Sequence, residues 1–375
     1  MTIKVHVGTR KGAFYLEGSN SRDNWQIKDP IFFGNIIYHF VPDPRDPNKA
    51  LIATKTGHLG PTVFRTSDAG KTWKEAGTPP RFPKDYGKSV NFVFWISPGH
   101  KSEPQVWYAG TSPQGLFKSL DGGDTWDVVE GHHTSELINE VRESNGGTPA
   151  GPLLHSINVD PSDKTHLIIA HSGGGLFESF DEGGSWKPLN ENVRADFFPD
   201  PYPEWGHCIH NAQIHPADSR IFYQQNHCGV YKLDRRENAS NNHWERIGEN
   251  IEGNQDLEHD MGFPLIVHPR DVNKIWTVPM DGSDVWPRTS IDGKPALHHT
   301  EDGGKTWVRQ HNGLPPANAY FTVLRQATAH DFQDPLGIYF GTKSGEVWAS
   351  FDEGENWQCI AQNLPQVYSL EVSSD

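Results

Sequence analysis

The chain has 375 residues, of which 22% are charged, and its formal net charge at pH 7 is −15. This charge argues against a nucleic-acid partner, because phosphate backbones are bound by clustered Lys and Arg, and the sequence has no basic stripe with interleaved aromatic residues. No apolar run approaches the length that spans a bilayer, and the first residues are typical of a strand rather than a signal peptide. We therefore expect a cytoplasmic protein that binds no membrane, and we leave its oligomeric state open.

A short acidic, glycine-rich segment that ends in tryptophan recurs at intervals of about fifty to sixty residues. Five copies are clear, at residues 67–73, 119–126, 179–186, 300–307 and 350–357, and two degenerate copies end at Trp25 and Trp244. Repeats of this length indicate a radial or solenoid array, and seven of them predict a seven-bladed β-propeller, an all-β fold. We expect residues 1–375 to form this single domain.

Each clear copy predicts a tight hairpin, which residues 179–186 (Ser-Phe-Asp-Glu-Gly-Gly-Ser-Trp) illustrate. The Asp carboxylate can accept hydrogen bonds from backbone amides across the turn, and the glycine after it supplies a positive φ at no steric cost. The Ser or Thr hydroxyl can bond nearby, and the Trp ring is expected to be buried between neighbouring sheets. We therefore assign the hairpin aspartates a structural role.

Four short strands are expected in each repeat. Blade one takes residues 4–8, 13–16 and 25–27, and we expect the C-terminal strand 367–372 to complete it and so remove an open sheet edge. The other blades are expected, in chain order, at 36–41, 50–54, 63–66 and 72–75; 92–96, 106–109, 116–119 and 125–129; 154–159, 167–170, 176–179 and 185–188; 208–214, 221–225, 229–233 and 244–247; 263–267, 274–278, 296–300 and 306–309; and from 320 through 337–341 and 347–350 to 357–360.

The strand order assigns polar residues to two faces. Turns between the first and second strands share one face with the Asp hairpins, and we expect His215, His268 and His330 there in structural roles. The crossovers and the loops between the second and third strands share the opposite face, which also receives an insertion at residues 280–295. Insertions in a repeat usually map to the binding face. A functional pocket is therefore expected at the channel mouth opposite the hairpins.

The residues expected at this mouth fall into two groups. Because imidazole, phenol and carboxyl groups can transfer protons, we predict catalytic roles for His58, His155, His210, His227, Tyr38 and Glu258. Cationic, aromatic and amide side chains suit a polar or anionic small-molecule or carbohydrate substrate, and we predict substrate contacts for Arg10, Lys11, Lys55, Trp95, Gln225, Asp281, Arg288 and Lys343.

A metal site is the second interpretation of the same histidines. Converging imidazoles suit Zn²⁺ or another divalent first-row ion, and the predicted ligands are His39, His155, His210 and His227. No His-Glu-x-x-His segment and no paired cysteine motif supports this set, so acid–base chemistry without a metal stays open. Cys208 and Cys228 fall in one blade, and we interpret them as reduced buried thiols rather than as a disulfide or metal ligands.

The hairpin pattern resembles the Asp-box, or bacterial neuraminidase repeat, and the whole chain resembles sialidase-like propellers. It is most similar to bacterial glycosyl-hydrolase-like repeat proteins of undefined activity, in the segments 8–12, 57–61, 154–157, 223–230 and 262–264. Sialidases clamp a carboxylate with three arginines, whereas the predicted mouth offers Arg10 and Arg288, with Arg325 lower on an inner strand. The resemblance therefore implies a carbohydrate-active hydrolase or lyase, and not a true sialidase.

The alternative is a non-catalytic scaffold. Propellers of this kind also resemble assembly factors for photosynthetic complexes and sorting-receptor ectodomains, which bind a protein or peptide partner through a face or the channel. An exposed apolar patch would serve such a partner. The aromatic residues that can form one in the loops between blades are Phe32, Phe33, Phe197, Phe198, Tyr202 and Trp205.

Overall fold

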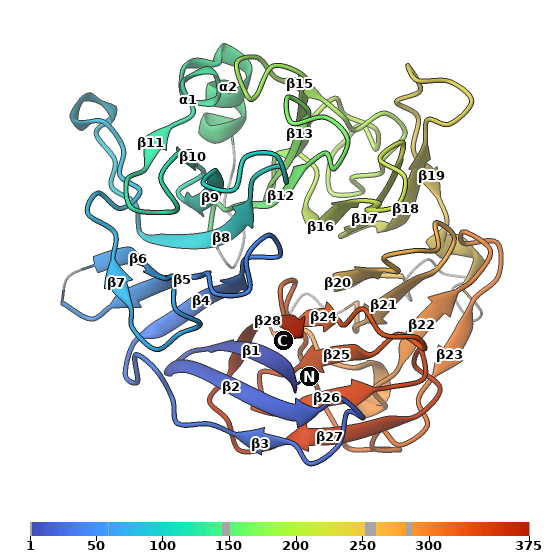
Figure 1. The fold of residues 1–375 in the computed structure, drawn as a ribbon. Helices are drawn as coiled ribbons and strands as arrows, with labels where there is room; N and C mark the ends of the chain where they lie inside the picture. The colour runs from blue at the N-terminus through green and yellow to red at the C-terminus, as the bar shows by residue number, and fades with distance from the viewer. Residues whose placement is uncertain (1, 59, 145–150, 252–259, 283–286, 375) are drawn as a thin grey trace.

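A computed structural model describes residues 2–58, 60–144, 151–251, 260–282 and 287–374. They form seven antiparallel sheets of four strands each, arranged around a central axis (Figure 1). The innermost strands of successive blades contact one another all the way round, and the last contacts the first. The expected seven-bladed β-propeller is confirmed. Two parts of the earlier predictions, Glu258 and residues 283–286 of the insertion, lie outside the described residues.

Blades one to four run outward from the axis in the following order. Blade one has β28 (Val367–Ser374), β1 (Thr2–Thr9), β2 (Gly12–Ser19) and β3 (Gln26–Ile27). Blade two has β4 (Ile36–Pro42), β5 (Ala50–Thr56), β6 (Gly60–Thr66) and β7 (Lys74–Glu75). Blade three has β8 (Phe92–Pro98), β9 (Trp107–Ser112), β10 (Leu116–Ser119) and β11 (Asp127–Val128). Blade four has β12 (Leu154–Val159), β13 (Leu167–His171), β14 (Gly175–Ser179) and β15 (Lys187–Pro188).

The remaining three blades repeat the pattern. Blade five has β16 (Ile209–Ile214), β17 (Ile221–Asn226), β18 (Gly229–Asp234) and β19 (Glu245–Arg246). Blade six has β20 (Gly262–Val267), β21 (Ile275–Pro279), β22 (Leu297–Thr300) and β23 (Val308–Gln310). Blade seven has β24 (Thr328–His330), β25 (Ile338–Gly341), β26 (Val347–Ser350) and β27 (Trp357–Ala361).

The two ends of the chain close the ring within blade one (Figure 1). Strand β28 pairs with β1 from Ile3 opposite Ser374 to Thr9 opposite Val367. The backbone groups of β1 are therefore satisfied on both sides, and the N-terminal strand is not an exposed edge. The predicted closure by the C-terminal strand is confirmed.

The Asp hairpins form the expected hydrogen bonds. In residues 179–186, Asp181 Oδ1 accepts hydrogen bonds from the Ser185 amide at 2.8 Å and from Ser179 Oγ at 2.7 Å, and Trp186 donates its indole N–H to Gly183 O at 3.0 Å. One detail differs from the expectation: the residue directly after the Asp also has a positive φ, and it is not always glycine. Glu182, with φ 59°, occupies this position, so the hairpin's hydrogen bonds hold a non-glycine residue in the left-handed region.

Two α-helices between blades three and four were not expected from the sequence. They are α1 (Glu130–Thr134) and α2 (Glu136–Ser144). Buried Ile138 and Val141 anchor α2 on its apolar side, and Arg142 Nη2 donates to His132 Nδ1 at 2.9 Å. Short 3-10 turns occur at Lys84–Tyr86, Gly248–Asn250 and Ile291–Gly293. Among the described residues, no helix has the length and apolar character needed to cross a bilayer.

A register irregularity interrupts the inner pair of strands in blades one to six. In each of these six pairs the inner strand has one extra residue, and in four of them it is a single unpaired residue; a β-bulge of this kind turns a side chain away from its regular direction. The extra residues are Tyr368, Tyr38, Phe94 and His210. The bulges therefore place large rings at a similar level of the inner strands in several blades.

Candidate functional site

Rings from the bulges and one arginine form a connected layer across the channel. Tyr38 lies 5.8 Å from Tyr368 and 6.4 Å from Phe94 between ring centroids. The Arg325 guanidinium lies 5.8 Å from the rings of both Phe94 and Phe263, and Phe263 lies 4.7 Å from His210. We call the set the channel layer; its members are Tyr38, Phe94, His210, Phe263, Arg325 and Tyr368.

A cavity of about 760 Å³ lies on the hairpin side of this layer. The inner strands of all seven blades contribute to its wall, and Trp95 and Arg325 line it together with turn residues of the hairpin face such as Gly70. His39 also lines it, and its ring is held by two hydrogen bonds: the Ile96 amide donates to Nδ1 at 3.0 Å, and Nε2 therefore donates to Glu371 Oε1 at 3.3 Å. This cavity thus opens on the face that the sequence interpretation left without a ligand.

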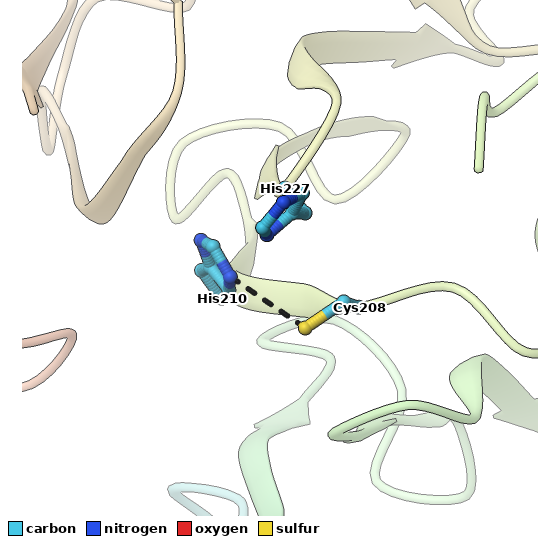
Figure 2. Close-up of side chains that lie close together, drawn as sticks. All are labelled: Cys208, His210 and His227. Atoms are coloured by element: carbon cyan, nitrogen blue, oxygen red, sulfur yellow. Dashed lines mark hydrogen bonds between the residues drawn. The ribbon is translucent and has the colours of Figure 1, made fainter. Parts of the chain in front are cut away.

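A cluster of one thiol and two imidazoles lies in blade five (Figure 2). Its members are Cys208, His210 and His227, whose potential ligand atoms all lie within 4.8 Å of one another. Cys208 Sγ is 3.6 Å from His210 Nε2. Cys208 and His210 flank the start of β16, and His227 follows β17, whose pairing with β16 brings the His227 amide to 3.0 Å from Cys208 O. Local strand pairing therefore assembles the cluster.

The hydrogen bonds of His210 fix its tautomer. Its Nδ1 lies 2.5 Å from Gly262 O, and because a carbonyl only accepts, Nδ1 carries the proton. The Nε2 lone pair then points to Cys208, whose thiol donates to it. Burial, with a smaller effect from the nearby Arg325 charge, holds the pKa of His210 well below its usual value. His210 is therefore a neutral imidazole with an available lone pair.

Positive charges surround this cluster. Burial raises the pKa of the Cys208 thiol, and the charges of Arg325 and Arg288 partly oppose that shift. Arg288 Nη2 lies 3.5 Å from His227 Nε2, and Arg325 donates from Nε to His210 O at 3.0 Å. Burial lowers the pKa of Arg325 to about 10. Among the described residues, no carboxylate forms an ion pair with Arg288 or Arg325.

Further cations lie at the same mouth. The positive charge of Arg10 acts to lower the pKa values of both Tyr38 and Lys343, so these three residues of blades one, two and seven lie within electrostatic range of one another. Burial raises the pKa of Tyr38 to about 12 and lowers that of Lys343. Lys55 lies over the Phe92 ring, which stacks on Tyr38 at 4.4 Å. The predicted substrate contacts Arg10, Lys55 and Lys343 therefore do gather around Tyr38.

The structure places other predicted residues apart from the Cys208 cluster. His39 lines the hairpin-side cavity, and His58 is exposed in the β5–β6 turn. His155 is fully buried with Nδ1 bonded to Ser156 Oγ at 2.9 Å, and its Nε2 has no partner among the described residues. Within the part of the chain that is described, neither His39 nor His155 joins a group of three potential ligands.

Several residues predicted to contact the substrate form hydrogen bonds or ring contacts within the protein. Gln225 is buried and donates from Nε2 to Asp260 O at 2.7 Å, while its Oε1 has no partner in the described ranges. Asp281 Oδ2 accepts from the Thr289 amide at 2.6 Å and so shapes the blade-six insertion. Trp95 lies 5.2 Å from the His39 ring, on the cavity side, and Lys11 is exposed beside Phe33.

Two members of the site were assigned other roles by the sequence interpretation. Cys208 was interpreted as a plain thiol, although Cys208 and His210 are two positions apart, the spacing that places strand side chains on one face. Arg325 was expected lower on the inner strand of blade seven, and it lies just before β24, between the mouth and the cavity. The bulge at His210 is a tertiary feature that no sequence signal indicated.

The chain is similar in sequence to xyloglucanases, and no protein-family model matches it. It is 27% identical over 177 residues to xyloglucanase Xgh74A of Acetivibrio thermocellus, which covers 41% of this chain and 20% of that protein. It is 20% identical to a "probable oligoxyloglucan-reducing end-specific xyloglucanase" of Neosartorya fischeri, over 94% of this chain and 36% of the relative. The chain thus spans between 16% and 36% of the length of the curated relatives it matches.

Solved structures show the same fold at low identity. An ancestral GH74 enzyme superposes with a TM-score of 0.55 at 16% identity, over 90% of this chain and 38% of that one. YCF48 from Cyanidioschyzon merolae superposes with a TM-score of 0.50 at 13% identity, over 93% and 92% of the two chains. A second structure, of YCF48 bound to D1 peptide, gives a TM-score of 0.50 at 13% identity. Membership of the sialidase-like superfamily stays a prediction.

Proposed function

We propose that this protein is a carbohydrate-active hydrolase whose substrate binds at the channel mouth around Tyr38, Arg288 and the Cys208 cluster. The observation that carries the proposal is the sequence similarity to xyloglucanases, which in one relative extends over 94% of the chain. Identity at this level supports a class of reaction rather than a substrate. The residues of the mouth must therefore supply the argument for what is bound there.

The mouth suits a polar or anionic sugar. Tyr38 stacks between Phe92 and Tyr368, so the site has a fixed aromatic wall. Arg10 and Lys55 stand beside this wall, and neither has a carboxylate partner among the described residues. Ligand sites commonly combine apolar walls with a few converging polar groups. In a protein of net charge −15 this local excess of cations favours substrates that carry a carboxylate.

Imidazoles supply the proton transfers in this proposal. Hydrolysis requires one group to take a proton from the attacking water and another to give a proton to the leaving glycosidic oxygen. In the metal-free chain, the neutral Nε2 of His210 can accept a proton from substrate water in place of the Cys208 thiol, and half-buried His227 lies 5.6 Å from His210 between ring centroids.

A substrate panel with a single-residue variant tests the proposal. Purified protein is incubated with xyloglucan oligosaccharides and with acidic oligosaccharides, and release of reducing ends is measured. His227→Ala is expected to lower kcat/KM by about 100-fold or more, since acid–base groups contribute 10²–10⁴-fold, while Tm stays within about 2 °C. His311→Ala, at an exposed position, is the matched control. Full turnover in His227→Ala, or no turnover of any glycan by the unaltered chain, contradicts the proposal.

A peptide-binding scaffold is the second candidate. This chain covers 85% of YCF48 in the structure of YCF48 bound to D1 peptide, whereas it covers 38% of the ancestral GH74 enzyme. Phe197, Phe198 and Tyr202 are exposed, and the Phe197 ring lies 6.0 Å from His227. Phe32, by contrast, stacks on Phe64 at 4.2 Å, and Trp205 packs against the core. Stoichiometric capture of a peptide that Phe197→Ala weakens, together with inert histidines, favours this function.

A further inference from the structure

We propose that Cys208, His210 and His227 form a binding site for one transition-metal ion of the Zn²⁺ class. The proposal goes beyond the proposed hydrolase, because it stands on the geometry of blade five and holds whether or not the chain cleaves carbohydrate. It also changes the ligand set expected from the sequence. His39 and His155 leave that set, and Cys208 enters it.

The spacing of the donor atoms fits a tetrahedral ion. Zinc bonds of about 2.3 Å to sulfur and about 2.05 Å to nitrogen at a tetrahedral angle require a sulfur–nitrogen separation of about 3.6 Å. The observed distance from Cys208 Sγ to His210 Nε2 is 3.6 Å. The third donor, on His227, lies within 4.8 Å of both. His227 is half-buried in a turn after β17, and its ring has to move toward Cys208 and His210 for all three donors to bind one ion.

The protein already orients His210 as a ligand. Metal-binding histidines usually donate their other ring N–H to a carbonyl or carboxylate, which fixes the ring and directs the free lone pair at the ion. Nδ1 of His210 makes this bond to Gly262 O, on the neighbouring blade six. Cys208 is held by the backbone bond between its carbonyl and the His227 amide. Two of the three donors are therefore placed before any ion binds.

The donor set selects the class of ion. A thiolate and two imidazoles suit Zn²⁺ and neighbouring first-row ions, and they suit Mg²⁺ or Ca²⁺ poorly because those ions prefer oxygen ligands. When the ion binds, the Cys208 thiol bond to hydrogen is replaced by a sulfur–metal bond and the proton passes to solvent. The ion keeps its charge, so no oxidant or reductant is needed.

The two arginines determine what completes the coordination. Arg288 and Arg325 would repel a bare dication, and the thiolate cancels only one of its two charges. An anion in the fourth position, such as hydroxide or the carboxylate of a ligand, removes the remaining excess. The half-buried Arg288 side chain is held by two long contacts, from Nη1 to Asp281 O at 3.4 Å and from Nη2 to His227 Nε2 at 3.5 Å, and in this proposal it exchanges the second contact for such an anion.

Metal titration of the full-length protein tests the site without an activity assay. Chelator-treated protein is titrated with Zn²⁺ by calorimetry and with Co²⁺ by absorption spectroscopy. We expect one ion per chain, a rise in Tm with Zn²⁺, and a thiolate-to-cobalt charge-transfer band. Cys208→Ser is expected to weaken Zn²⁺ binding by about 100-fold and to remove the band, and His227→Gln to weaken binding while the band remains.

Matched cysteine variants separate this site from general thiol chemistry. Cys359→Ser removes a half-buried thiol in blade seven and is expected to bind Zn²⁺ as the unaltered chain does. Circular dichroism of each metal-free variant confirms that it is folded. Absence of stoichiometric Zn²⁺ in the unaltered chain, or equal affinity in Cys208→Ser, overturns the proposal. If the unaltered chain hydrolyses a glycan but binds no stoichiometric Zn²⁺, the proposed function stands and this site fails.

Discussion

The hairpin of Asp181 and the channel mouth use polar groups in opposite ways. In the hairpin of Asp181, both carboxylate oxygens have partners, because Ser185 bonds one through its amide and the other through its hydroxyl. At the mouth, buried polar atoms without a partner among the described residues occur at His155 Nε2, Gln225 Oε1 and Asn226 Nδ2. Native proteins leave few buried polar atoms unpaired, and those that remain require an explanation.

This difference separates structural polar residues from functional ones. A side chain whose hydrogen bonds are complete within the protein contributes to stability and has nothing left for a ligand. A buried atom without a partner destabilises the free protein, and a ligand that satisfies it recovers that free energy. The contrast predicts that substitutions on the hairpin side lower stability, whereas the His227→Ala substitution at the mouth lowers activity alone.

The largest stability effect is expected at a buried ion network between blades four and five. Arg235 contacts Glu178 through Nη1 at 2.6 Å and Nη2 at 3.0 Å, and both side chains are 7% exposed. Arg235→Ala leaves a buried carboxylate without its main partner, so unfolding free energy should fall by about 3–5 kcal/mol in urea titrations. Arg236→Ala, which removes an exposed pair with Asp234, should cost about 1 kcal/mol or less. Equal effects in the two variants would contradict this assignment.

The same network predicts a pH dependence. Burial alone would lower the pKa of His166, but its hydrogen bonds to Asp160 and Glu178, both 2.8 Å, outweigh this and raise it to about 9. Because the pKa of His166 is higher in the folded than in the unfolded state, its stabilising contribution, on the order of 3 kcal/mol, is complete below pH 6.5 and is lost as pH rises through about 9.

The loss of stability at acid pH follows from Asp160, which is hydrogen-bonded to His166. Burial opposes ionisation of Asp160, yet its hydrogen bonds to His166 and Ser162 lower its pKa to about 2, so its contribution is present above its unfolded pKa of 3.8 and is lost as pH falls through 2. Urea midpoints measured from pH 5 to pH 10 check the alkaline limb. In the His166→Gln variant the urea midpoint should fall less between pH 6.5 and pH 10. An equal fall in the variant would show that other groups cause the alkaline loss of stability.

The smallest effect is expected in a single Asp hairpin. Asp181→Ala removes an acceptor for the Ser185 amide and hydroxyl and for Ser179 Oγ. Because these bonds lie at the surface, we expect a loss of about 1–2 kcal/mol, seen as a lower thermal midpoint. Asp196→Ala, at an exposed aspartate outside the hairpins, serves as the control and should change stability little. A neutral Asp181→Ala would end the structural role proposed for the hairpin carboxylates.

Much of the fold could be predicted because its determinants are local. The Asp-Gly turns and their Trp residues mark each blade within a few residues, and the unpaired strand at 367–372 indicated the closure that β28 makes with β1. The helices α1 and α2 depend on tertiary contacts such as Arg142 with His132, which no local pattern shows.

The site was predictable in composition more than in arrangement. The histidines of the mouth were identified by counting strands, and the approach of His227 to His210 follows from the pairing of β16 with β17. His39 lies apart from these two histidines because of the register of β4 with β5. A one-residue bulge at Tyr38 changes which side chains of the strand share a face. Sequence alone gives no sign of these bulges, so neither the cavity nor the Cys208 cluster could be derived from it.

The channel layer has an implication for how such proteins diversify. Tyr38, Phe94 and Tyr368 are extra residues in the inner strands of three adjacent blades, and the Tyr38 ring contacts the other two rings. Replacing one of these residues is expected to change which ligands fit at the channel layer, while the strand pairing that stabilises the propeller is unchanged. Selection can therefore retune ligand preference one blade at a time, so paralogues with unrelated ligands are expected to share every strand and differ at this level.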